Sequence, residues 1–151
     1  MSAICFSKSI DYALIALAFL AERPERVWST REVGAGTGVP VSVLANVLKD
    51  LQAGGVVRSV RGAAGGYQIR GDLQAWSILS LIELLEDGDS PAAKREPVAG
   101  PLAALRARMR RFLGDVRVSD LVLPGRRIDV PLEAVRFKTN KNEPVGVAPT
   151  A

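Results

Sequence analysis

The 151-residue chain contains no histidine and a single cysteine, Cys5. These two counts exclude a disulfide within the chain, a zinc site built from Cys and His ligands, a catalytic triad with a histidine base and a four-cysteine iron–sulfur cluster. Acidic side chains remain as metal ligands, but none are grouped with the spacing of a ligand loop. We therefore expect no metal, no cofactor and no enzymatic activity.

The chain also lacks a long hydrophobic run. Its most apolar stretch, residues 12–21, is about half as long as a helix that spans a bilayer. Only Lys8 precedes this stretch with a positive charge, and no small-residue cleavage site follows it, so we expect no signal peptide. The predicted protein is cytoplasmic and has no membrane contact, and Cys5 is expected to be reduced.

The composition is otherwise ordinary, with 48% apolar and 24% charged residues, and it predicts one compact domain with room for an additional arm. The net charge of +4 is uneven, because residues 1–90 carry a net −2 and residues 91–151 a net +6. A pI near 9.6 favours a polyanionic partner such as nucleic acid. Arginines gathered in the C-terminal part are equally typical of a solvated face.

The first predicted helix follows Ser7 and ends before Pro24, which disfavours helical geometry in the residue preceding it. Its apolar residues lie on every side. Such a helix is buried all round, and because the chain is small, we expect part of this surface to face a second subunit.

A helix pair is predicted next. Ser29 and Glu32 form a capping box, so a short helix should begin at Thr30. The following helix should begin at Pro40 and end at Gly54, with one apolar face made of Leu44, Val47, Leu48 and Leu51. Two helices joined by a short turn that contains glycine are typical of a helix-turn-helix unit.

A β-hairpin is predicted after this pair. Residues 56–60 alternate as a strand, residues 61–66 form a glycine-rich turn, and residues 67–69 form a returning strand. The ribbon carries Arg58 and Arg61, and its size and charge suit it to reach the DNA backbone or the minor groove. The alternative is an ordinary surface hairpin with two solvated arginines. The predicted fold class is mainly α with a small β-hairpin wing.

Two more helices are predicted, the first at residues 78–86. After Pro101, apolar residues recur at spacings of three and four, as in a heptad seam: Leu102, Leu105, Met109, Phe112 and Val116. The seam needs a cover, either its own domain or a partner subunit, and we favour the partner. We assign residues 1–87 to a winged helix-turn-helix domain and 88–100 to a linker. Residues 101–122 are assigned to a long dimerisation helix with the turn that follows it, and 123–151 to a partly mobile C-terminal extension.

The wing sequence is the most specific part of the chain: Val57-Arg58-Ser59-Val60-Arg61-Gly62-x-x-Gly65-Gly66-Tyr67. Together with Tyr12-Ala13-Leu14 and Val39-Pro40, it resembles the Rrf-two family of bacterial winged-helix regulators. The resemblance implies a homodimer that binds a palindromic site in double-stranded DNA, with a recognition helix in the major groove and a wing arginine in the minor groove. The predicted DNA-binding residues are Ser29, Thr30, Ser42, Val43, Asn46, Lys49, Arg58, Ser59, Arg61, Gly62, Gly65 and Gly66.

The chain departs from the family at two places. Many members hold an iron–sulfur cluster with three cysteines between the fourth helix and the dimerisation helix, and this chain has none there. Asp11 matches the acidic ligand of some members, but one carboxylate cannot hold a cluster. Val43 stands where many members have an aromatic residue. We expect a cluster-free repressor; the alternatives are a sensor of an unknown small molecule or partner protein, or an interaction module that has lost specific DNA binding.

Overall fold

The computed structural model describes residues 7–86 and 100–123. Cys5, the predicted linker up to residue 99 and the predicted extension from residue 124 onward lie outside the described residues. In order, the elements are α1 (Lys8–Ala21), α2 (Thr30–Thr37), α3 (Val41–Ala53), β1 (Val57–Val60), β2 (Gly66–Ile69), the 3-10 turn η1 (Leu73–Ala75), α4 (Ile78–Glu86), α5 (Pro101–Asp115) and α6 (Val118–Val122). The predicted class, mainly helical with a small hairpin, is confirmed.

Helix α1 lies at the centre of the helical part and contacts α2, α3, α4 and α6. One of its faces is fully buried: Ile10, Ala13, Ala16, Leu17 and Leu20. Its apolar surface is otherwise half-buried, except for Ile15, which is 43% exposed. Its own domain therefore covers most of α1, and little of it is left for a second subunit.

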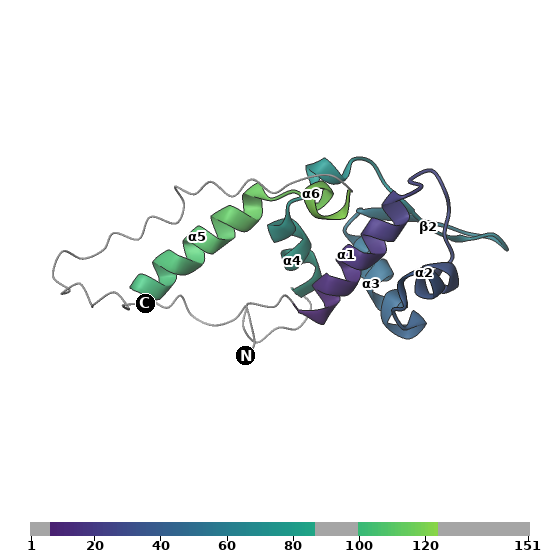
Figure 1. The fold of residues 1–151 in the computed structure, drawn as a ribbon, viewed down its shortest axis with the longest axis horizontal. Helices are drawn as coiled ribbons and strands as arrows, with labels where there is room; N and C mark the ends of the chain where they lie inside the picture. Colours follow the sequence, from purple (N-terminus) through teal and green to yellow (C-terminus); the bar gives the residue numbers. More distant parts are fainter. Residues whose placement is uncertain (1–6, 87–99, 124–151) are drawn as a thin grey trace, which may run out of the picture.

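The hairpin is antiparallel, with Arg58 opposite Gln68 and Ser59 opposite Tyr67. A third segment joins the other edge of β2, because Trp28 and Tyr67 exchange two backbone hydrogen bonds of 2.9 and 2.8 Å. The wing is therefore tied to the loop that leads into α2. Figure 1 shows the hairpin projecting beyond α2 and α3 at one end of the molecule, while α5 extends at the opposite end.

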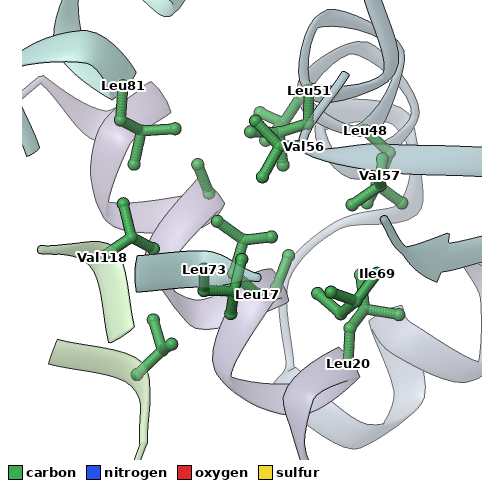
Figure 2. Packing of buried hydrophobic residues seen from close by; sticks show 14 of the residues in the cluster. Leu17, Leu20, Leu48, Leu51, Val56, Val57, Ile69, Leu73, Leu81 and Val118 are labelled. Atoms are coloured by element: carbon green, nitrogen blue, oxygen red, sulfur yellow. The ribbon is translucent and has the colours of Figure 1, made fainter. Parts of the chain in front are cut away.

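The hydrophobic core lies between these helices and the base of the hairpin. Figure 2 shows side chains from α1, α3, β1, β2, η1, α4 and α6 meeting there, among them Leu17, Leu20, Leu48, Leu51, Val56, Val57, Ile69, Leu73, Leu81 and Val118. Burying one such side chain contributes about 1.5–3 kcal/mol. The helix pair and the wing thus rest on one shared core.

The segment after α5 differs from the prediction. Val116 was predicted to continue the heptad seam, but it is 8% exposed and belongs to the core. Its carbonyl accepts a hydrogen bond from the Ile78 amide (2.9 Å), and the Val118 amide donates to the Trp76 carbonyl (2.8 Å). Where a turn was expected, α6 packs against α1. Residues 116–122 therefore complete the core of the first domain.

Candidate nucleic-acid interface

Helix α3 has one buried and one exposed face. Leu44, Val47, Leu48 and Leu51 point into the core, as predicted. Ser42, Asn46 and Lys49 are exposed, and their spacings of four and three residues bring them onto one face of the helix. This face offers a hydroxyl, a carboxamide and an ammonium group.

Two valines at the start of α3 are placed differently from expectation. Val43, a predicted DNA contact, is only half-exposed and packs against the core. Val41, which the sequence reasoning did not select, is 47% exposed. The exposed apolar group in the first turn is therefore Val41, while Val43 also helps to anchor the helix.

The amino end of α2 carries the predicted capping box. The Ser29 hydroxyl accepts a hydrogen bond from the Glu32 amide (3.2 Å) and donates one to Glu32 Oε2 (2.8 Å), while the Ser29 amide donates to the same oxygen (2.8 Å). These bonds from the Ser29 amide and hydroxyl lower the pKa of Glu32 below its ordinary value of 4.5. The Ser29 hydroxyl is thus already engaged, and Thr30 is the half-exposed residue beside it.

Sequence reasoning missed Arg26 beside this cap. Its guanidinium lies 3.8 Å from the centre of the Trp28 ring and donates to Glu32 Oε1 at 2.7 Å. The ring of Trp28 in turn packs against Phe19, with 4.7 Å between ring centres. Arg26 therefore offsets the carboxylate at the start of α2. No periodic pattern signals this contact, because it joins a loop to a helix.

The wing tip is formed by residues 61–66. Gly62 has a φ of +119°, a conformation that favours glycine, as predicted. Gly65 and Gly66 do not have positive φ values, contrary to expectation, and they are required for close packing instead. A Cβ at Gly65 would lie 2.5 Å from the Val60 carbonyl oxygen, and one at Gly66 would overlap the Trp28 carbonyl.

Arg61 is the free cation of the wing. It is exposed, and within residues 7–86 and 100–123 it takes part in no hydrogen bond or ion pair. The Gly65 amide, which was predicted to face phosphate, donates to the Gly62 carbonyl at 2.9 Å. The tip is thus closed by its own backbone, and the Arg61 side chain is available to a ligand.

Arg58 is held in place, unlike Arg61. Its Nε and Nη2 both donate to the Gln68 Oε1, at 3.0 and 2.7 Å, and the Gln68 Nε2 donates to the Glu25 carbonyl at 2.6 Å. Sequence reasoning missed Gln68. Its position opposite Arg58 follows from the hairpin register, which could have suggested the pair.

Four of the five residues predicted to form the dimerisation seam lie on α5. Leu102, Leu105, Met109 and Phe112 are 37–50% exposed, so this row is open among the described residues. Helix α5 contacts α4, where the Arg110 guanidinium donates to Glu83 Oε1 at 2.5 Å. The exposed row ends at Phe112, because Val116 turns into the core.

The sequence matches the family model described as "Rrf2: Iron-dependent Transcriptional regulator" over residues 6–123. The chain belongs to the Rrf2 family. It is 38% identical to an HTH-type transcriptional regulator of Aquifex aeolicus over 82 residues, which are 54% of this chain and 57% of that protein. It is 35% identical to an rrf2-like regulator of Rhodobacter capsulatus over 91 residues, 58% of this chain and 59% of that protein. The chain thus spans less than two thirds of these curated relatives.

Two solved structures share the fold of this chain. Staphylococcus aureus CymR superposes with a TM-score of 0.61 at 25% identity, covering 82% of this chain and all of that one. T. potens IscR superposes with a TM-score of 0.63 at 22% identity, covering 80% of this chain and 87% of that one. The fold is therefore the winged helix of CymR and IscR.

The described residues of this Rrf2 chain do not fit an iron centre, although the family description names iron. Residues 7–86 and 100–123 contain no group of three or more Cys, Asp or Glu side chains that could hold a metal ion. Asp11 is exposed in the first turn of α1. The whole chain has no histidine and one cysteine.

Among the helices of residues 7–86 and 100–123, none is long and apolar enough to cross a membrane.

Proposed function

We propose that this Rrf2 regulator binds double-stranded DNA as a homodimer, without an iron–sulfur cluster, and represses transcription by occupying a promoter. One observation carries the proposal: an arginine with no partner among the described residues, Arg61, stands at the tip of a hairpin that is hydrogen-bonded to the loop before α2, beside a helix with an exposed polar face. A narrow minor groove attracts such an arginine through its negative potential.

The recognition helix α3 is proposed to enter the major groove. Asn46 is the side chain suited to bind adenine through two hydrogen bonds, while Ser42 and Lys49 add a hydroxyl and a cation on the same face. Val43 contributes apolar contact with thymine methyl groups. With so few base-reading groups, we infer that groove shape supplies part of the specificity.

The DNA backbone is proposed to meet groups on either side of α3. Thr30 and the amide end of α2 face one phosphate, with Ser29 holding the helix end in place. Arg58, Ser59 and the Gly62 amide face another, and Gly65 and Gly66 shape the tip that lets the backbone approach. Such contacts set orientation and carry no sequence information.

The homodimer is proposed to form through the exposed row on α5. Apolar side chains at heptad spacing need a second helix to cover them, and the same row on another copy provides one. Two-fold pairing then predicts two half-sites about one helical turn apart, roughly 34 Å, on one face of a palindromic operator.

The test begins with selection of duplexes from random DNA by the purified protein. Arg61→Ala should weaken binding to the selected duplex by about 1–3 kcal/mol and relax base preference in the minor groove. Arg111→Ala, which removes an exposed arginine from α5, is the matched control and should bind like the wild type. Equal affinities of Arg61→Ala and wild type would refute the wing assignment.

The salt dependence of affinity separates this proposal from an interaction module. Phosphate contacts release counterions, so the logarithm of the binding constant should fall steeply and linearly with the logarithm of salt concentration. A binding constant that hardly changes with salt, with no enriched duplex, would favour the interaction module instead.

A further inference from the structure

We infer that Gln68 is a positioning residue of the DNA interface, and that it orients Arg58 toward a phosphate. The inference rests on the proposed DNA binding. Gln68 is 8% exposed and lies in β2, directly across the hairpin from Arg58. It is one of few polar side chains buried in the described part of the chain, and both ends of its carboxamide are engaged.

The first step concerns which atoms of Arg58 are used. A guanidinium group has five N–H donors. The Nε and Nη2 donors of one edge meet the single oxygen of Gln68, at 3.0 and 2.7 Å. The adjacent edge, formed by Nη1 and the second N–H of Nη2, retains two parallel donors. This is the geometry that binds two oxygens of one phosphate.

The second step concerns how Gln68 itself is held. Its Nε2 donates to the Glu25 carbonyl at 2.6 Å, so the amide nitrogen faces the backbone and the oxygen faces Arg58. Reversing the carboxamide would place an N–H group against the guanidinium. Glu25 belongs to the loop between α1 and α2, and this loop also carries Trp28, which pairs with Tyr67. Arg58 is therefore fixed relative to the start of α2.

The two wing arginines then differ in kind. Arg58 is already ordered and gains a phosphate without further loss of side-chain freedom, whereas Arg61 is free and becomes ordered only on binding. Immobilising a long side chain at an interface weakens binding by about 3- to 10-fold. Releasing Arg58 from Gln68 should reduce DNA affinity by the same factor.

The test is a double-mutant cycle on the duplex enriched from random DNA, read by fluorescence anisotropy. Gln68→Met, which removes the oxygen but keeps the shape, should weaken binding about 3- to 10-fold for each half-site. In an Arg58→Met background the same substitution should change affinity less than 2-fold. A purely structural glutamine would lower the melting temperature and weaken binding equally in both backgrounds, and that result would overturn the inference.

Arg58→Lys keeps the test decisive even where Gln68→Met fails to fold, because Arg58 is exposed. A lysine retains the charge but cannot present two parallel donors. It should lose about 3- to 10-fold in affinity for each half-site while keeping the wild-type salt slope. Arg58→Met removes one phosphate contact from each subunit of the proposed dimer and should reduce that slope by about 1.8. Wild-type affinity in Arg58→Lys would refute the inference alone. Failure of the wild-type protein to bind any duplex would instead refute the proposed function, and the inference with it.

Discussion

The wing is joined to the loop before α2 by the hydrogen bonds between Trp28 and Tyr67, and Gly66 lets the two segments approach closely. One added methyl group at Gly66 tests this connection. In Gly66→Ala, the new Cβ would overlap the Trp28 carbonyl oxygen and lie 2.5 Å from the Trp28 carbonyl carbon and 2.8 Å from the Ser29 amide nitrogen. These are backbone atoms, which cannot rotate away as a side chain can. Strand β2 and the segment that contains Trp28 must therefore move apart.

The expected cost follows from the contacts that are lost. Separation breaks the two hydrogen bonds between Trp28 and Tyr67, each contributing about 0.5–1.5 kcal/mol. Overpacking adds about 1–3 kcal/mol. We expect Gly66→Ala to lower the free energy of unfolding by roughly 2–6 kcal/mol and to weaken DNA binding, because the wing loses its fixed position.

The assay is urea-induced unfolding followed by far-ultraviolet circular dichroism at one protein concentration. Gly114→Ala is the matched control. It adds the same methyl group inside α5, where the new Cβ would lie in ordinary van der Waals contact, 3.8 Å from Leu79 Cδ2. Alanine is favoured over glycine in a helix by roughly 0.5–1 kcal/mol, so this variant should be slightly more stable. An unchanged unfolding midpoint in Gly66→Ala would refute the reasoning.

Three further predictions concern other parts of the fold. Because its folded-state pKa is lowered, Glu32 stabilises the fold fully above about pH 4.5 and loses this effect as the pH falls through the lowered value. The melting temperature of Glu32→Gln should therefore fall less steeply in acid than that of the wild type. Parallel plots of melting temperature against pH for the two proteins would contradict this. Val116→Ala should cost about 1–3 kcal/mol of unfolding free energy, whereas Phe112→Ala should change it by less than about 0.5 kcal/mol in the dilute monomer. Met109→Arg should give monomers in sedimentation velocity and abolish specific DNA binding, and a dimeric variant would exclude α5 as the pairing surface.

Local patterns predicted the first half of the chain well. The Ser29–Glu32 capping box was predicted at the correct residues, because both partners lie within one helical turn. The two strands of the hairpin were predicted from the glycine-rich turn and the alternating residues on either side of it, within one residue of their observed bounds. The four buried residues of α3 followed from helical periodicity.

Long-range contacts could not be predicted in this way. Helix α6 has only five residues, and its packing depends on α1, which lies about a hundred residues earlier in the chain. Val116 fits the heptad spacing, but the helix ends at Asp115 and the next residue turns inward. Gly66 was predicted to supply a positive φ at the wing tip, whereas its constraint comes from close packing against the Trp28 backbone.

The same distance in sequence limited the prediction of the candidate interface. Arg61 was predicted as a DNA contact from its place beside the glycine turn and from the resemblance of the wing to the family. Gln68 was missed because its partners, Arg58 and the Glu25 carbonyl, lie on a facing strand and in a distant loop. The engagement of Ser29 in its own cap also needed atomic positions, since a hydroxyl beside a helix end is compatible with either role.

The return of the chain from α5 into the domain determines how the molecule can be divided. Val118 and Val122 close one side of α1. Backbone hydrogen bonds join Val116 to Ile78, the first residue of α4, and Val118 to Trp76, which lies just before it. A fragment that stops at residue 86 would retain both α3 and the wing, yet it would expose this side of α1 to water. A chimaera that exchanges the projecting helix between relatives would therefore have to leave residues 116–122 with the domain that contains α1.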